Sequence, residues 1–239
     1  MNRLEFINTG LALMGLSHYQ SDKRMNIDPH LLIGKGSPKL VGKNHYLLTE
    51  VDQSFQKMHT AAQKQGIIIK IVSSYRSFDR QKSIWNRKFI NFKSQGMTDE
   101  NAIAKIIEYS TLPGTSRHHW GTEIDIIDSG PPEEGDVLLP HKFHDQGPYT
   151  ALREWMERHA REYGFFLPYT QDKNRTGFKY EPWHYSYAPL SRPMLKSYLE
   201  LDLSQWILSK DLKGSPLLGG VFLENYIQSH VKGIDSSLL

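Results

Sequence analysis

The feature that most constrains the fold is an almost unbroken run of β-branched residues, Ile-Ile-Ile-Lys-Ile-Val, at 67–72. Such a run predicts a buried β-strand. A second strand is predicted over Gly121–Ile127, where apolar and acidic side chains alternate with a period of two. Two further short strands are expected at 165–166 and 183–187. The chain therefore contains a small sheet made of short, widely separated segments.

Helical periodicity fills much of the chain between these strands. Apolar residues recur at helical spacing over 49–65, 78–92, 98–109 and 149–163, and the tail from Ser191 onward is also mostly helical. Helices and strands are interspersed without a regular strand–helix–strand alternation. We therefore predict an α+β fold, with a small mixed or antiparallel sheet flanked by helices and a helical C-terminal extension.

The length of 239 residues fits one large domain with extensions. We expect residues 46–190 to carry the chemistry. Residues 1–45 are expected to be an irregular lead-in packed on this core, because glycine and proline are frequent before residue 45. Residues 191–239 are expected to extend the same domain with helices.

The chain contains no cysteine, which excludes a cysteine nucleophile, thiolate metal ligands and disulfide bonds. Any metal must therefore be bound by histidine, aspartate or glutamate. The 29 basic and 26 acidic residues give a net charge of +3, and no basic run concentrates it. We therefore expect no nucleic-acid partner.

No segment reaches the ~20 apolar residues of a membrane-spanning helix, so no membrane partner is expected. The apolar segment 11–16 follows Arg3, as in an export signal, but it is short. Glu5 and Asn8 lie in the same region, and no small-residue cleavage site follows. We predict a cytoplasmic protein, with a periplasmic location as the alternative.

Three short segments contain most of the polar residues whose side chains could take part in catalysis or metal binding. They are 73–77, 116–125 and 181–185. His118 and Asp125 are seven residues apart with a glycine between them, which suits a loop ligand followed by a strand ligand. His184 would add a second imidazole. Two histidines and one carboxylate are a common ligand set for catalytic Zn²⁺, whose fourth position stays open.

Glu181 is the candidate general base beside such a metal. A catalytic Zn²⁺ polarises a carbonyl and lowers the pKa of water towards ~7, and the proton needs an acceptor that is not itself a ligand. Pro182 disfavours helix at Glu181, so Glu181 and His184 cannot share a helical face. A bend at Pro182 is required if both are to meet one metal.

Other interpretations of these residues remain open on the sequence alone. A single histidine is usually a hydrogen-bonding residue, and His119 is expected to be structural or to support the metal site. His141, His144 and Asp145 could form a rival site in a loop rich in proline and glycine, with a solvated loop as the alternative. Arg76, on a predicted loop, could be a surface charge.

The three polar segments resemble the motifs of the zinc D-alanyl-D-alanine carboxypeptidases of the VanY type. These belong to the LAS group, which contains lysostaphin, D-Ala-D-Ala peptidases and sonic-hedgehog-like domains. The motif S-x-H-x-x-G-x-A-x-D is met in register by Ser116, His118, Gly121 and Asp125. The motif E-x-W-H is met by Glu181, Trp183 and His184. The upstream S-x-Y/F-R-S motif with its following glutamine is met by Ser74, Arg76, Ser77 and Gln81.

The resemblance implies a LAS-type core and one Zn²⁺ ion held by His118, Asp125 and His184. It implies Glu181 as the catalytic base. Arg76 would bind the terminal carboxylate of the substrate or stabilise the developing oxyanion, and its planar guanidinium suits either task. The substrate-binding residues expected in the same pocket are Gln81, Ser116 and Trp183.

Glu123 departs from the resemblance, because it occupies the alanine position of the central motif. By strand alternation it shares a face with Asp125 and so lies close to the metal. Two interpretations are open: Glu123 pairs with a nearby cation such as Arg117, or it contacts an amine of the substrate and changes specificity. The second interpretation adds Glu123 to the predicted substrate-binding residues.

We predict from this resemblance a zinc carboxypeptidase that removes a terminal D-alanine from peptidoglycan stem peptides. In the cytoplasm, cleavage of L,D bonds in muropeptides fits cell-wall recycling, whereas D,D cleavage would attack the cell's own precursors. The partner is a small peptide or muropeptide, and the oligomeric state stays open. The alternatives are a peptidoglycan endopeptidase and a non-catalytic zinc-binding module. The latter would not require both Glu181 and Arg76.

Overall fold

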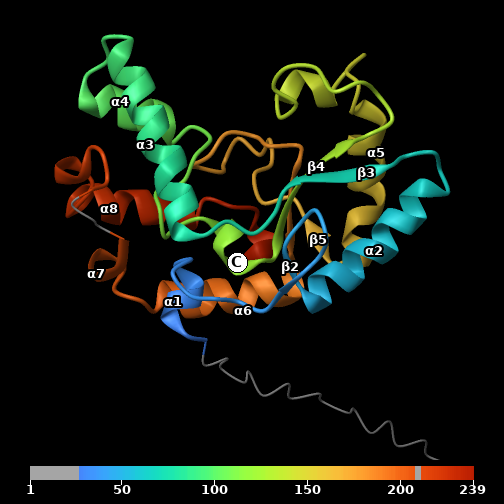
Figure 1. Ribbon diagram of the computed structural model, residues 1–239, viewed down its shortest axis with the longest axis horizontal. Helices are drawn as coiled ribbons and strands as arrows, with labels where there is room; N and C mark the ends of the chain where they lie inside the picture. Colours follow the sequence, from blue (N-terminus) through green and yellow to red (C-terminus); the bar gives the residue numbers. More distant parts are fainter. Residues whose placement is uncertain (1–26, 208–210) are drawn as a thin grey trace, which may run out of the picture.

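Four short strands form one antiparallel sheet in the order β3-β4-β6-β5 (Figure 1). They are β3 (Ile69–Ser73), β4 (Glu123–Asp128), β5 (Phe165–Phe166) and β6 (His184–Tyr187). The computed structural model describes residues 27–207 and 211–239, so the apolar segment 11–16 lies outside the described residues. The predicted α+β fold is confirmed, and the sheet is the antiparallel one of the two predicted forms.

Strand β4 is the centre of this sheet, with β3 on one side and β6 on the other. All six of its residues are buried. Ile124 and Ile126 face an apolar cluster that includes Met58 and Trp155. The alternate positions Glu123 and Asp125 are therefore carried on the opposite face of the strand.

Helices α2 (Thr49–Gln63) and α5 (Thr150–His159) cover the apolar face of the sheet (Figure 1). The first begins where predicted and ends two residues early, before Gly66, which has a φ of +81°. The second is shorter than the predicted 149–163, because residues 160–163 tighten into a 3₁₀ turn before Gly164. Tightening of this kind is common at helix ends.

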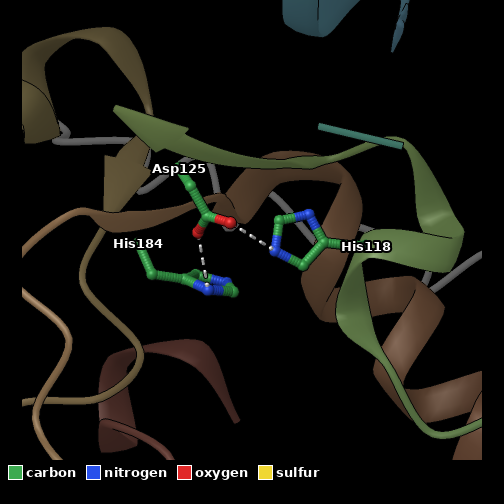
Figure 2. Close-up of side chains that lie close together, drawn as sticks. All are labelled: His118, Asp125 and His184. Atoms are coloured by element: carbon green, nitrogen blue, oxygen red, sulfur yellow. Dashed lines mark ion pairs between the residues drawn. The ribbon is translucent and has the colours of Figure 1, made fainter. Parts of the chain in front are cut away.

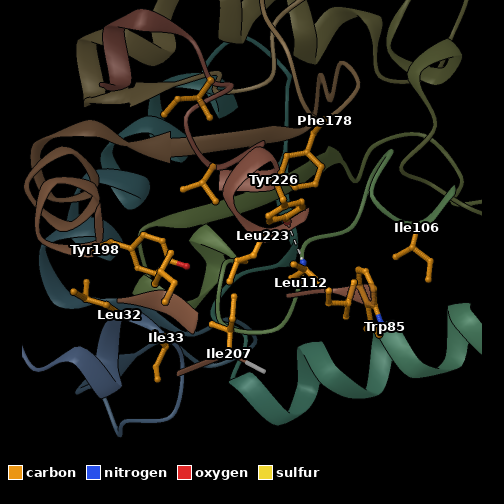
Figure 3. Close-up of a cluster of buried hydrophobic side chains, with 14 of the residues drawn as sticks. Leu32, Ile33, Trp85, Ile106, Leu112, Phe178, Tyr198, Ile207, Leu223 and Tyr226 are labelled. Atoms are coloured by element: carbon orange, nitrogen blue, oxygen red, sulfur yellow. Dashed lines mark hydrogen bonds between the residues drawn. The ribbon is translucent and has the colours of Figure 1, made fainter. Parts of the chain in front are cut away.

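A second apolar cluster lies among the remaining helices (Figure 3). Its largest members include Trp85 of α3 (Phe78–Ser94) and Ile106 of α4 (Asp99–Ile106). Leu32 of α1 (Pro29–Leu32) and Tyr198 of α6 (Ala188–Leu199) belong to the same cluster. Described residues on both sides of the segment 46–190 therefore pack into one core with it.

The C-terminal segment is helical, as predicted, through α6, α7 (Leu203–Ile207) and α8 (Val221–Tyr226). Helix α6 begins at Ala188, three residues before the predicted start, with Pro189 in its first turn. Proline is favoured there because its missing N–H has no partner to lose. The lead-in contributes α1 and β1 (Leu40–Val41), which pairs as a two-stranded hairpin with β2 (Leu47–Leu48) at the start of the segment 46–190. Within the described residues, no helix combines the length and apolarity needed to cross a membrane.

Gly34, just after α1, tests how tightly the lead-in packs on the site. Its φ is +76°, and a Cβ at this position would overlap the imidazole ring of the buried His119. We expect Gly34→Ala to lower the free energy of unfolding by about 2 kcal/mol or more, because a positive φ costs about 1–2 kcal/mol and the clash adds to it. Urea denaturation measures the change.

Gly66→Ala is the matched control. Gly66 has a similar φ of +81°, but a Cβ added there would have no atom within 4 Å. We expect this variant to lose only the conformational part, about 1 kcal/mol. Equal losses in the two variants would contradict a packed contact between Gly34 and His119.

Candidate metal centre

Asp125 lies in the middle of β4, directly opposite Ser73 of β3 and His184 of β6. His118 reaches the same point from the 3₁₀ turn Arg117–Trp120 that precedes β4. Gly121 ends this turn with a φ of +70°, in the left-handed region that favours glycine. The chain can therefore turn sharply between the loop residue His118 and the strand residue Asp125.

These three side chains form a buried group, with one donor atom of each lying within 4.8 Å of the others. Figure 2 shows the Asp125 carboxylate between the two rings. Its Oδ2 lies 3.3 Å from His118 Nε2, and its Oδ1 lies 3.3 Å from His184 Nδ1. Within the described part of the chain, no other group of histidine and carboxylate side chains is placed to hold a metal.

Each ring presents a defined nitrogen to this group. His118 Nδ1 lies 2.6 Å from the Ser74 carbonyl oxygen, which can only accept, so Nδ1 carries the proton and Nε2 is free to bind a metal. Burial lowers the pKa of His118, which favours the neutral ligand form. His184 Nε2 lies 2.9 Å from Glu123 Oε2, so Nε2 carries the proton and Nδ1 faces Asp125.

Asp125 has the properties of a metal ligand. Burial alone would raise its pKa, but the neighbouring His118 and His184 hold the pKa well below its ordinary value. The carboxylate is therefore ionised. Its Oδ1 is buried without a hydrogen-bond partner in the described structure, and the 3.3 Å contact to His184 is an ion-pair distance only. Two imidazole nitrogens and one unsatisfied carboxylate oxygen fit a divalent ion such as Zn²⁺.

Glu181 lies beside the group but outside it. The turn at Pro182, closed by a 3.1 Å hydrogen bond from His184 N to Glu181 O, supplies the bend that the sequence requires. Glu181 Oε2 comes to 3.2 Å from His184 Nδ1. Burial raises the pKa of Glu181, with His184 acting in the opposite direction. This places a carboxylate of raised basicity on the wall of the cavity next to the candidate metal ligands.

Arg76 faces the same cavity from the segment after β3. Its guanidinium donates to Gln81 Oε1 at 2.8 Å and to Ser73 Oγ at 3.0 Å, and lies 3.9 Å from Asp125 Oδ2. Its backbone N–H donates to the carbonyl of His118. Arg76 is thus oriented by two neutral hydrogen-bond acceptors, makes a long ion pair with Asp125, and lines the cavity.

Gln81 and Glu123 do not take the positions predicted for substrate contacts. Gln81 is fully buried behind Arg76, where it bonds Arg76 and the Thr111 carbonyl, and it does not line the cavity. Gln81 is therefore placed to hold Arg76, and its direct contact with substrate stays a prediction. Ser116 and Trp183 do line the cavity, and their contacts with substrate stay predictions.

Glu123 is fully buried behind His184 and does not line the cavity. Its Oε2 accepts from His184, while its Oε1 accepts from Ser186 at 2.7 Å and from Thr122 at 3.0 Å. Arg117 NH2 lies 3.4 Å from the same Oε1. The interpretation of Glu123 as a partner of Arg117 therefore agrees with the geometry. Contact with a substrate amine does not, because the carboxylate is sealed from the cavity.

The remaining histidines of the sequence analysis lie apart from this group. His119 is buried, accepts from Gly114 N through Nε2 and donates from Nδ1 to the Arg76 carbonyl. Burial lowers its pKa to about 3, so it is a neutral structural residue. His144 contacts the Tyr180 hydroxyl, and the rival set of His141, His144 and Asp145 forms no candidate metal group among the described residues.

The cavity has a volume of about 370 Å³ and includes residues that the motifs missed. Tyr169 packs edge-on against His184 with ring centroids 5.0 Å apart, and its carbonyl accepts from Glu181 N. Lys88 lies on α3, seven residues after Gln81. Residues seven apart share a helix face, so this spacing was the sequence signal that could have added Lys88 to the predicted pocket residues. Tyr169 lies in an irregular loop and gave no signal in the sequence.

The comparisons with known proteins agree with this geometry. The family profile described as "VanY: D-alanyl-D-alanine carboxypeptidase" matches residues 44–190. One relative is VanXYC of Enterococcus gallinarum, a bifunctional D-Ala-D-Ala dipeptidase and D-Ala-D-Ala carboxypeptidase. It is 30% identical over 191 residues, which cover 80% of this chain and 85% of the relative. A D-alanyl-D-alanine carboxypeptidase of Enterococcus faecalis is 30% identical over 56% of this chain, which spans only 45% of that relative's length.

Two solved structures share the fold. VanYB in complex with D-alanine-D-alanine has a TM-score of 0.54 at 23% identity, covering 74% of this chain and 91% of that one. A mutant of the vancomycin resistance D,D-pentapeptidase VanY in complex with Zn(II) has a TM-score of 0.51 at 24% identity, covering 68% and 83%. These likenesses support the LAS-type core predicted from the motifs.

Replacing Glu123 with glutamine tests the contact behind His184. The substitution removes the negative charge but keeps an oxygen that can accept from Nε2. We expect the affinity for Zn²⁺ to fall about 10- to 100-fold, because a carboxylate partner fixes the ligating ring and raises its basicity. Competition between the metal-free protein and a chromogenic chelator measures this affinity.

Glu50→Gln is the matched control, since Glu50 accepts from Tyr187 of the same strand β6. It makes the same chemical change without altering the partner of His184, so we expect wild-type affinity. A Glu123→Gln protein that is folded by circular dichroism and binds Zn²⁺ as tightly as the control would refute this role for Glu123.

Proposed function

The chain belongs to the VanY family of D-alanyl-D-alanine carboxypeptidases, and on that premise we propose that it is a zinc-dependent carboxypeptidase acting on peptidoglycan stem peptides. It would remove a terminal D-alanine by hydrolysis. The observation that supports the proposal most strongly is that one cavity is lined by the His118–Asp125–His184 group together with Glu181 and Arg76. A binding module would need the metal ligands but not a buried base beside them.

We assign the metal to His118 Nε2, His184 Nδ1 and the Asp125 carboxylate. A bound Zn²⁺ supplies Lewis acidity towards the scissile carbonyl and lowers the pKa of water. Glu181 accepts the proton of the attacking water and returns it to the nitrogen of the leaving D-alanine. Burial raises the pKa of Glu181, which brings its basicity closer to neutral pH and suits both transfers.

Arg76 completes the proposed site. Its fixed guanidinium can bind the terminal carboxylate of the peptide or stabilise the negative charge that develops on the scissile carbonyl oxygen. Ser73 and Gln81 hold the guanidinium from behind, so the group is oriented before substrate binds. Such preorganisation is the main source of electrostatic stabilisation in enzymes. Ser116 and Trp183 are proposed to line the pocket for the terminal residue.

We further propose that the substrate is a small muropeptide rather than intact cell wall. A cavity of about 370 Å³ suits the end of a peptide. In a cytoplasmic setting, removal of D-alanine across an L,D bond serves the recycling of recovered tetrapeptides, whereas D,D cleavage would act on the cell's own precursors. We therefore favour L,D cleavage there, and D,D cleavage would accord with a periplasmic location.

Mass spectrometry of defined muropeptides tests the reaction. The zinc-loaded protein is incubated with tripeptide, tetrapeptide and pentapeptide forms. Alanine released from the tetrapeptide indicates L,D cleavage, and alanine released from the pentapeptide indicates D,D cleavage. Fragments cut inside the stem indicate an endopeptidase, and no release of alanine from any form overturns the proposal. Treatment with a chelator should abolish the reaction, and added Zn²⁺ should restore it.

Glu181→Gln separates catalysis from metal binding. We expect kcat to fall about 10²- to 10⁴-fold, because proton transfer by a positioned base contributes a factor of this size. The Zn²⁺ content, measured by atomic emission, should not change, since Glu181 is not among the proposed ligands. Glu162→Gln, at an exposed carboxylate that contacts His159, is the matched control. Loss of Zn²⁺ together with activity would contradict the assignment of Glu181 as base.

A further inference from the structure

Lys88 is a cation in the wall of the cavity that the proposed reaction does not use. It lies on α3, seven residues after Gln81, and lines the same cavity as Arg76 and Glu181. Seven residues of helix correspond to about 10 Å along its axis. Lys88 is therefore displaced along the cavity wall from the part of α3 that contacts Arg76.

The ammonium of Lys88 is half-buried and has one short contact, a 2.6 Å hydrogen bond from Nζ to Ser110 Oγ. Over residues 27–207 and 211–239, no carboxylate oxygen lies within the 4.0 Å ion-pair distance of Nζ. Asp136 also lines the cavity, but its Oδ1 accepts from the Leu138 N–H in its own loop. The hydroxyl of Ser110 is a neutral partner, and the carboxylates of Glu181 and Asp136 act on Lys88 only from beyond the ion-pair distance.

An ammonium group that is partly withdrawn from water without a counter-ion is in an unfavourable state. Burial accordingly lowers the pKa of Lys88, and Arg76 lowers it further, while Glu181 acts in the opposite direction. A negatively charged group of a ligand would compensate this charge. Lys88 lines the same cavity as the candidate metal ligands, so the negatively charged group would belong to a molecule that also reaches the candidate metal centre.

A second negative charge on the same peptide would fit this position. An extended peptide rises about 3.3 Å per residue, so the two residues before the terminal D-alanine lie within about 7 Å of it along the chain. Arg76 lies at the catalytic end, where the proposed function places the terminal D-alanine. A group near Lys88 would then belong to a residue upstream of the scissile bond.

We propose that Lys88 and Ser110 form a subsite for a free carboxylate carried by the stem peptide upstream of the scissile bond. The inference rests on the proposed function and specifies its substrate class, namely peptides that keep an acidic group one or two residues before the terminal D-alanine of a tetrapeptide. That carboxylate has two sources. It is the α-carboxylate left free by a γ-linked glutamate at the second residue, or the side-chain carboxylate of a diamino dicarboxylic acid at the third.

Three matched tetrapeptides test the subsite. One carries both carboxylates free, one has the second-residue α-carboxylate as an amide, and one has the third-residue side-chain carboxylate as an amide. We expect amidation of the carboxylate that binds Lys88 to raise KM about tenfold or more with little change in kcat, because a hydrogen bond to a charged group is lost before the reaction begins. The peptide affected identifies the source.

Lys88→Met should bind and cleave all three peptides with similar KM, near the value of the amidated peptide in the wild type. Lys88→Arg keeps the charge and should restore most of the preference. Lys82→Met is the matched control, because Lys82 lies on the same helix but pairs with Asp79 and Asp211 and does not line the cavity. It should keep the full preference.

Binding of the three peptides is then measured by calorimetry on zinc-loaded Glu181→Gln, with and without Lys88→Met. This experiment tests the subsite independently of whether the protein catalyses the proposed reaction. A preference for the free carboxylate that depends on Lys88 supports the subsite even if the wild type releases no alanine, in which case only the proposed function fails. Equal binding of all peptides by the protein with Lys88 intact overturns the subsite. An equal loss on all peptides in Lys88→Met also overturns it, since that result indicates a structural role.

Discussion

The antiparallel register that sets Asp125 of β4 opposite His184 of β6 is the constraint on which the rest of the site depends. Facing residues of paired strands hold their Cβ atoms about 4.5–5.5 Å apart, which is close enough for both side chains to reach one ion. On its other side, Asp125 faces Ser73 of β3, which bonds Arg76. A slip of one residue would bring Ile124 to this face and move Asp125 into the apolar cluster. The core beneath β4 therefore enforces the arrangement of the candidate ligands.

Two acidic residues on one face of β4 act on opposite sides of the same ring. Asp125 approaches His184 Nδ1, and Glu123 binds its Nε2. Burial would raise the pKa of Glu123, but Arg117 and His184 lower the pKa to about 2, so the carboxylate is ionised. A buried charge needs such partners, because without them its desolvation is strongly unfavourable. The departure of this chain from the family motif is thus accommodated by a charged network, to which Ser186 also contributes.

The sequence predicted most elements of the sheet and its flanking helices, though not α1 or the β1–β2 hairpin, and it predicted the meeting of the three motifs, because hydrophobic period and motif spacing are local properties. It did not predict which groups the polar residues would contact. Alternation placed Glu123 on the face of Asp125, yet only the register with β6 shows that it meets His184. Gln81 follows Arg76 by five residues, and only the start of α3 at Phe78 directs it at the guanidinium instead of the cavity. Contacts of this kind depend on strand pairing and helix placement, which local patterns do not specify.

Residues beyond the matched segment 44–190 support the helix that carries part of the cavity wall. Helix α3 turns Lys88 towards the cavity and Trp85 towards the apolar cluster. The indole N–H of Trp85 donates to the carbonyl of Lys213 at 3.0 Å, and Asn86 accepts from the N–H of Lys213 at 2.9 Å. The C-terminal segment thus anchors the face of α3 that points away from the cavity. Because a helix is rigid over two turns, this anchoring also fixes the part of the cavity wall on which Lys88 lies.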